Sequence, residues 1–371
     1  MPRRRRNFLA LGVLFCLALV VAGCTGGSPI AIPTPSRPPS DLPELSRSAG
    51  IPIGTGVNDA RMVNKNYQQR VLDNFTSITP ANAFKWENTE PAQGQFDFGK
   101  PDPLVQFAVD HHLRVRGCCL TWRTQNPAWL ESGTFTKAQA TAIMRDHIRA
   151  VVGRYKGKVA QWEVVNEIFH TVNGQLAPFN SVWLKTIGPG YVADAFRTAR
   201  AADPNALLFA NEFGNDGPGP HFNAFYNKVR ALKLAGVPID GVGLQMHRGL
   251  QTPTVAQVEE TIRKYAALGL RVEITEFDIP LPLPPDQQAL EQQGVLFGQI
   301  TSVCLRIAAC TGITFWGVDD NDRYPAIRTS NRGAMTMFDE MGNPKPAYFA
   351  VVNALRAAPA IKRLSGGPPA G

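Results

Sequence analysis

Eight short apolar segments rich in β-branched residues recur along this chain, and they constrain its fold more than any other feature. They occupy residues 51–57, 77–79, 113–120, 159–165, 206–210, 241–245, 270–275 and 312–318. Most are separated by stretches with helical spacing of apolar residues, such as residues 137–154 and 191–201. Strands that alternate with helices predict a parallel sheet, and eight such units predict an α/β fold of the (β/α)8 TIM barrel type.

The alternative α/β architecture is an open, doubly wound sheet. That fold commonly carries a Gly-x-Gly-x-x-Gly turn at the start of a helix, and no such turn opens a helix here. A chain of 371 residues with 44% hydrophobic composition can bury one large core. We therefore predict a single barrel domain over residues 45–360.

The N-terminus has the pattern of an export signal. Arginines at positions 3–6 precede an apolar run over residues 8–22, which is shorter than a membrane-spanning helix. The sequence at 21–24, Val-Ala-Gly-Cys, resembles the lipobox of bacterial lipoproteins, so residues 1–23 are expected to be cleaved and Cys24 to be lipidated. An ordinary cleaved signal is the alternative. Arg5 and Arg6 also resemble a twin-arginine signal, with plain arginine-rich flanking as the alternative.

Two further segments are predicted to be disordered. Residues 24–44 are rich in Pro, Ser and Gly and should form a tether, and residues 361–371 should form a tail. Together with the signal, the tether predicts an exported protein that is lipid-anchored to the bacterial cell envelope and lies outside the cytoplasm.

Charge and motifs exclude several classes of partner. The net charge is +8, but the four arginines at 3–6 lie in the predicted signal, and a remaining charge of +4 does not suggest nucleic acid. No nucleotide-binding motif or metal-ligand cluster is evident, so no cofactor is expected. We expect a monomer.

Polar residues follow the predicted strands at their carboxyl ends, where barrel enzymes carry their active sites. Glu167 ends the fourth segment and Glu276 ends the seventh, and a pair of carboxylates is what glycoside cleavage requires. Aromatic rings, amides and a lysine at the same rim suit a sugar. The residues expected at the rim are Asn82, Lys85, Trp86, Trp122, Gln125, Asn166, Glu167, Asn211, Glu212, Gln245, His247, Glu276, Asp278, Trp316, Asp319 and Asp320.

Six motifs in order resemble glycoside hydrolase family 10, the endo-β-1,4-xylanase family. They are TPANAFKWENTEP at 79–91, WEVVNE at 162–167, GLQMH at 243–247, ITEFD at 274–278, TFWGV at 314–318 and PKPAY at 344–348. The resemblance extends from about residue 45 to residue 355. It implies an enzyme that hydrolyses β-linked xylan-like polysaccharides or oligosaccharides by a retaining double displacement.

The resemblance also implies roles for individual residues. Glu167 would be the acid/base and Glu276 the nucleophile, oriented by His247 and Asp278, while Asn166 would bind the 2-hydroxyl of the sugar that becomes attached. The implied substrate-binding residues are Asn82, Lys85, Trp122, Gln125, Asn166, Gln245, Trp316 and Tyr324. The alternatives are purely structural roles: His247 could be a hydrogen-bonded core histidine, and the tryptophans, Trp86 above all, could be core aromatics.

Four positions depart from the family pattern. Ala81 stands where a glutamate is usual, Cys118 and Arg123 replace the two histidines of Gly-His-x-x-x-Trp-His, and Tyr324 replaces a second tryptophan. We hypothesise a substrate other than unsubstituted xylan, such as a branched or charged glycan or a glycoconjugate, with Arg123 meeting its carboxylate or phosphate. The alternatives are a catalytically weakened surface carbohydrate-binding lipoprotein and a transglycosylase.

The cysteines outside the signal fall into two pairs. Cys304 and Cys310 have a spacing at which the family often forms a disulfide, and export makes oxidation plausible. Cys118 and Cys119 are adjacent, and since a vicinal disulfide is strained we expect free thiols there.

Overall fold

Eight parallel strands close into a barrel in the computed structural model, which describes residues 41–172, 175–251 and 253–364. The prediction of a TIM barrel is thereby confirmed. The order around the ring is β1-β11-β9-β8-β7-β4-β3-β2. The strands are β1 (Ile53–Val57), β2 (Ser77–Pro80), β3 (Arg114–Thr121), β4 (Gln161–Asn166), β7 (Leu207–Glu212), β8 (Gly241–Leu244), β9 (Arg271–Phe277) and β11 (Cys310–Phe315).

The first and last strands of the ring pair with each other. Ile53 of β1 lies opposite Ile313 of β11, and Gly54 lies opposite Ser77 on the other side of β1. Every pair within the barrel is parallel. The carboxyl ends of all eight strands therefore lie at the same end of the barrel.

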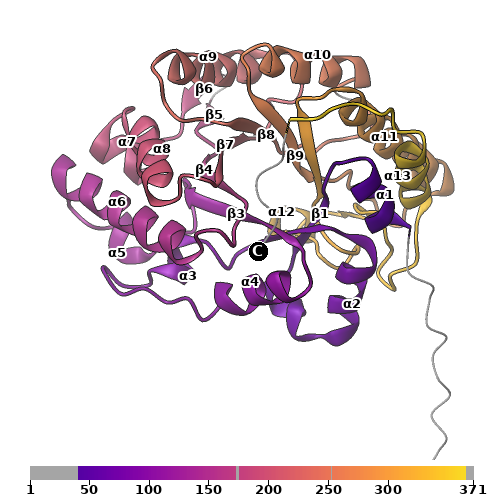
Figure 1. Cartoon of the computed structure of the whole chain (residues 1–371), viewed down its shortest axis with the longest axis horizontal. Coiled ribbons are helices and arrows are strands. Elements are labelled where there is room, and N and C mark those ends of the chain that lie inside the picture. The colour runs from indigo at the N-terminus through magenta and orange to yellow at the C-terminus, as the bar shows by residue number, and fades with distance from the viewer. Residues whose placement is uncertain (1–40, 173–174, 252, 365–371) are drawn as a thin grey trace, which may run out of the picture. The chain divides into compact units, whose positions relative to one another are not determined.

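Helices surround the strands and form the outer layer (Figure 1). Several begin with side-chain caps, and α6 and α10 carry full capping boxes at Thr136 and Thr254. The longer helices are α1 (Leu42–Ser48), α2 (Lys65–Asn74), α4 (Pro101–Asp110), α6 (Lys137–Arg154), α8 (Tyr191–Ala202), α9 (Pro220–Leu234), α10 (Val255–Ala266), α11 (Gln287–Arg306) and α13 (Pro346–Arg356). Shorter ones are η1 (Asp59–Val63), α3 (Trp86–Thr89), α5 (Ala128–Glu131), α7 (Val182–Ile187) and α12 (Pro325–Arg328).

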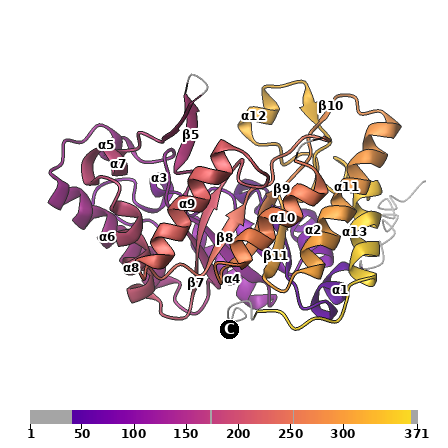
Figure 2. The same cartoon turned by 90° about the horizontal axis from the view of Figure 1, so that it is seen from above.

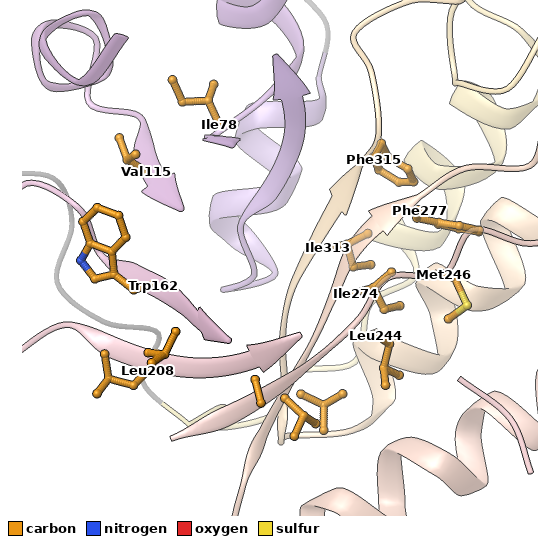
Figure 3. Close-up of a cluster of buried hydrophobic side chains, with 14 of the residues drawn as sticks. Ile78, Val115, Trp162, Leu208, Leu244, Met246, Ile274, Phe277, Ile313 and Phe315 are labelled. Atoms are coloured by element: carbon orange, nitrogen blue, oxygen red, sulfur yellow. The ribbon is translucent and has the colours of Figure 1, made fainter. Parts of the chain in front are cut away.

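The main apolar core lies between the strands and the helices. Strand residues such as Ile78, Val115 and Trp162 belong to one cluster of buried side chains that includes residues of the helices (Figure 3). Because side chains alternate along a strand, the neighbours of these residues point into the barrel.

Charged residues fill part of the barrel interior. Arg116 of β3 donates from Nε to Glu163 Oε1 of β4 at 2.7 Å and from Nη1 to Glu273 Oε2 of β9 at 2.9 Å. Strands β3 and β9 are not neighbours, so the second bond crosses the interior. All three side chains are almost fully buried.

Two small antiparallel two-stranded sheets stand outside the barrel. One pairs β5 (Phe169–Val172) with β6 (Gln175–Pro178) directly after β4, and the other pairs β10 (Leu281–Pro282) with β12 (Arg332–Gly333). Figure 2 shows β5 and the α12–β10 region projecting beyond the same end of the barrel. These segments form two walls at the carboxyl-end rim.

The boundaries of the folded part differ from the predicted ones. Helix α1 begins at Leu42, which is fully buried, so the folded part starts before residue 45. At the other end Arg363 donates to the backbone carbonyls of Ala49, Leu305 and Cys310, which places residues 361–364 against the barrel rather than in a tail. The predicted signal, Cys24, the tether up to residue 40 and residues 365–371 lie outside the described residues.

The cysteine predictions are confirmed. Cys304 at the end of α11 and Cys310 at the start of β11 form a disulfide, while Cys118 and Cys119 are buried free thiols. No helix among the described residues combines the length and apolarity that crossing a membrane requires.

Removing Arg116 should destabilise the protein strongly. Arg116→Met leaves Glu163 and Glu273 buried without their shared cation, and breaking a buried pair in this way costs about 3–5 kcal/mol of unfolding free energy. Urea unfolding followed by circular dichroism measures the loss. The double variant Arg116→Met/Glu163→Gln removes the unpaired glutamate while Glu273 keeps its contact with Arg114, and should recover part of the loss. An unchanged midpoint for Arg116→Met alone would contradict the assignment.

Candidate active site

A buried carboxylate ends strand β9 at the carboxyl-end rim. Glu276 accepts a hydrogen bond at Oε1 from Asn211 Nδ2 at 2.8 Å, and its Oε2 lies 3.0 Å from His247 Nε2. The other ring nitrogen, His247 Nδ1, lies 2.8 Å from Asp278 Oδ2. With two ionised carboxylates as acceptors, both ring nitrogens must donate, so His247 is an imidazolium in this arrangement.

The opposite charges of the triad formed by Glu276, His247 and Asp278 stabilise His247 as a cation and Glu276 as an anion. Burial by itself would lower the pKa of His247, but the negative charges of Asp278 and Glu276 and their hydrogen bonds raise it well above its usual range. Burial would likewise raise the pKa of Glu276, yet the hydrogen bond and charge of His247, the charge of Lys85 and the Asn211 amide lower it. Glu276 is therefore held as a carboxylate.

A second carboxylate, Glu167, follows strand β4 and has a left-handed backbone with φ of 53°. Glu212 of β7 holds the chain just beyond it, since Glu212 Oε2 accepts from Ile168 N at 2.8 Å and Phe169 N at 3.2 Å. A non-glycine residue in this conformation costs energy and persists where the surroundings fix it, as at functional sites.

Both oxygens of Glu167 contact protein donors. Gln245 Nε2 lies 3.2 Å from Oε1, and Arg123 Nε donates to Oε2 at 2.7 Å. Arg123 was expected to meet a carboxylate or phosphate of the substrate; in the structure its Nε is already paired with a carboxylate of the protein.

A chain of amides connects the two carboxylates. Gln245 Nε2, besides contacting Glu167, lies 3.2 Å from Asn166 Oδ1, and the same oxygen accepts from Asn211 Nδ2 at 3.0 Å. Asn211 Nδ2 also contacts Glu276. Asn211 is among the residues predicted at the rim from its position at the end of a predicted strand, but no role is predicted for it.

Lys85 turns toward the cysteines rather than into solvent. Its Nζ lies 3.2 Å from Cys118 Sγ and 3.6 Å from Cys119 Sγ, and 4.1 Å from the centroid of a Trp122 ring. Only 5% of Lys85 is exposed. The ligand atoms of Cys118, Cys119 and Glu163 lie within 4.8 Å of one another, but this ammonium group stands against the same thiols.

Asn82 and Gln125 lie together beyond strands β2 and β3. Gln125 Nε2 donates to Asn82 Oδ1 at 3.2 Å and to Glu87 Oε1 at 3.0 Å. Asp59 Oδ2 accepts from Asn82 N at 3.0 Å, and burial raises the pKa of Asp59 to about 6 against the opposing backbone hydrogen bonds. A cavity of about 480 Å³ opens beside them, with Asn58, Asp59, Asn82, Asn88 and Lys100 in its lining.

Sequence analysis did not single out Asp59. It comes two residues after β1, so its position just beyond a predicted strand could have indicated it.

Aromatic side chains stand around the triad. The ring centroids of Trp316 and Tyr324 lie 6.4 Å and 5.1 Å from that of His247. Trp316 packs against Gly56 of β1, where an added Cβ would come within 2.7 Å of the indole. Both rings are half-buried, so each keeps some surface exposed.

Three of the rim residues have structural surroundings instead. Trp86 is buried and stacks on His147 with ring centroids 3.5 Å apart. Asp319 pairs with Arg61 and Arg70, and Asp320 pairs with Lys345.

A pair of carboxylates at the strand ends of a closed barrel is the arrangement with which glycosidases cleave their substrates. The sequence profile of glycosyl hydrolase family 10 matches residues 41–354. The chain belongs to glycosyl hydrolase family 10. This family assignment agrees with the motifs and makes the protein a glycoside hydrolase that resembles endo-1,4-β-xylanases.

Individual members of the family are similar over most of the chain. Endo-1,4-beta-xylanase A from Phanerodontia chrysosporium is 37% identical over 314 residues, which cover 84% of this chain and 76% of that protein. Endo-1,4-beta-xylanase B from Thermotoga neapolitana is 33% identical over 288 residues, covering 77% and 82%. The crystal structure of xylanase 10B from Thermotoga petrophila RKU-1 in complex with xylobiose gives a TM-score of 0.81 at 33% identity, covering 85% and 97%.

His247 should keep its second proton above the usual imidazole range. Because folding raises its pKa, protonated His247 stabilises the fold fully below about pH 6.5, and this contribution is lost as the pH rises through the folded-state pKa. Long-range ¹H–¹⁵N NMR between pH 5 and 9, with His247→Gln to assign the signal, measures its protonation. Asp278→Asn should shift the titration to lower pH; a wild-type midpoint near 6.5 would contradict the triad.

Proposed function

We propose that this family 10 protein hydrolyses β-1,4 bonds inside xylan-like glycans by a retaining double displacement. The observation that carries the proposal is the link between its two carboxyl groups. One continuous line of side-chain contacts runs from β4 to β9, through Glu167, Gln245, Asn166, Asn211 and Glu276. Relatives named endo-1,4-beta-xylanase support the choice of substrate.

In the first step Glu276 attacks the anomeric carbon and forms a glycosyl ester while the glycosidic bond breaks. His247 and Asn211 keep its oxygens oriented, and the lowered pKa of Glu276 keeps it ionised. Glu167 supplies the proton to the departing sugar oxygen.

In the second step water attacks the same carbon and releases Glu276. Glu167, now a carboxylate, takes a proton from that water and returns to its starting state. Gln245 contacts Oε1 of Glu167 and keeps its carboxyl group beside the amide chain in both steps.

Sugar binding is assigned to side chains around these groups. Asn166 Nδ2 has no hydrogen-bond partner among the described side chains, so it is free to donate to the 2-hydroxyl of the attached sugar. Trp122, Trp316 and Tyr324 would cover the sugar faces, and Asn82 with Gln125 would bind hydroxyls further along.

A second candidate, a surface protein that binds glycans with weakened turnover, rests on Lys85. Its ammonium group faces two thiols and is nearly inaccessible, so it offers little to a substrate hydroxyl. Without a contact from Lys85 to a substrate hydroxyl, and with Ala81 in place of the usual glutamate, the sugar that is attacked would bind more weakly. Turnover measurements separate this candidate from the enzyme.

Mechanism-based labelling should identify the nucleophile. Incubation with 2-deoxy-2-fluoro β-xylobioside should add one glycosyl mass to the intact protein, and peptide mapping should place it on Glu276 because only the nucleophile forms the ester. Glu276→Ala should abolish the label, while Glu259→Gln on helix α10 serves as a control carboxylate and should keep it. Absence of label in the wild type, with glycan binding retained, would favour the binding protein.

Glu167→Ala should lower kcat/KM on xylo-oligosaccharides by about 10²–10⁴-fold, the usual contribution of a general acid. The loss should be much smaller for a dinitrophenyl β-xyloside, since that leaving group departs without a proton. Equal losses on both substrates would contradict the acid role.

We propose that the enzyme works outside the cytoplasm and that a lipid on Cys24 anchors it to the membrane. The arginine-rich start, the apolar run and the lipobox-like sequence before Cys24 support this placement. A Pro- and Ser-rich tether would hold the barrel away from the membrane surface.

The N-terminal peptide of protein made in a bacterial host should begin at a diacylated Cys24, as read by mass spectrometry, and the protein should partition into detergent. Cys24→Ser should stay unprocessed and unlipidated, since the thiol carries the lipid. A mature chain that begins beyond residue 24 and remains in the aqueous phase would contradict the anchor.

A further inference from the structure

Arg123 follows strand β3 and uses only part of its guanidinium to contact the site. Its Nε donates to Glu167 Oε2 at 2.7 Å, while 32% of the side chain remains exposed. A permanent cation thus stands directly beside the proposed acid/base.

The two terminal nitrogens of the Arg123 guanidinium make no hydrogen bond within the part of the chain that the structure describes. Within residues 41–172, 175–251 and 253–364, neither Nη1 nor Nη2 of Arg123 has a hydrogen-bond partner, whereas Arg116 and Arg61 both bond carboxylates through their terminal nitrogens. Two parallel N–H groups at the end of a planar fork match the two oxygens of a carboxylate.

The fork is held in place by aromatic contacts. The guanidinium carbon lies 4.2 Å from the ring centroid of Phe179 and 5.9 Å from that of Trp122. Phe179 follows the β5–β6 hairpin, donates its backbone N–H to Ile168 O at 2.9 Å, and stacks on His170 with centroids 4.0 Å apart. A cation fixed on a ring in this way loses little conformational freedom when it binds an anion.

We propose that Arg123 forms an anion subsite that takes the carboxylate of an acidic branch, such as a uronic acid, on a sugar flanking the scissile bond. The proposal rests on the proposed function, because Glu167 must reach the glycosidic oxygen for its neighbour Arg123 to lie beside that bond. The carboxylate would bind Nη1 and Nη2 while Nε keeps its contact with Glu167. Arg123 is then a specificity-determining residue.

The test compares three xylo-oligosaccharides of equal length: unbranched, bearing one uronic acid branch, and bearing the methyl ester of the same branch. The acid and its ester have nearly the same shape and differ in charge, so the ratio of their kcat/KM values isolates the carboxylate. For the wild type we expect the acid to be favoured by about tenfold, the size of a charge-assisted pair at a partly exposed site. The preference should shrink as salt is raised.

Arg123→Gln should bring this ratio close to one, and Arg123→Lys, a point charge without the fork, should retain part of it. Arg145→Gln is the matched control, since Arg145 pairs with Asp194 between helices α6 and α8 and should leave the ratio unchanged. Loss of Arg123 also changes the surroundings of Glu167, but that effect applies to both substrates and cancels in the ratio.

A wild-type ratio near one, or a tenfold ratio that survives in Arg123→Gln, overturns the proposal. Failure of the proposed function looks different, because the unbranched substrate would then also resist cleavage. In that event calorimetric binding of the acid and the ester to the wild type and Arg123→Gln decides the role of Arg123.

Discussion

Closure of the parallel ladder between β1 and β11 is the constraint on which the site depends. Ile53 and Ile313 are far apart in the sequence, and their pairing completes the ring that leaves no open strand edge within the barrel. Because all eight strands run in one direction, the same closure gathers every strand end at one rim. Glu167 and Glu276 therefore lie at the same rim, where the amides of Gln245, Asn166 and Asn211 connect them.

Charges within the barrel and at its rim are arranged for different purposes. In the interior, Arg116 bridges Glu163 and Glu273 in a buried network, and Arg114 is a second cation beside Glu273. At the rim, His247 lies between Asp278 and Glu276 and keeps Glu276 oriented and ionised, while 23% of the His247 side chain remains exposed. The interior network supports the strands from which the rim groups extend.

The departures from the family pattern have a common physical outcome. At the position where a histidine is usual, the Cys118 thiol contacts Lys85. The hydrogen bond with Cys119 and burial raise the pKa of Cys118 well above its usual range. Arg123 pairs with Glu167 through one nitrogen and keeps two for a ligand. These altered residues contact other side chains of the site, while Glu276 keeps its contacts with Asn211 and His247.

The sequence by itself determined the barrel, its eight strands and the strand-end positions of the two glutamates, because hydrophobic periodicity and strand-end motifs are local patterns. The Cys304–Cys310 pair followed from the resemblance to the family. It could not determine that Asn211 joins Asn166 to Glu276, that Lys85 faces the thiols, or that Arg123 meets Glu167. Each of these contacts depends on side-chain directions from different strands, and only the closed tertiary structure sets those distances. The ends of the folded part were displaced for a similar reason, since Leu42 and Arg363 are held by contacts distant in sequence.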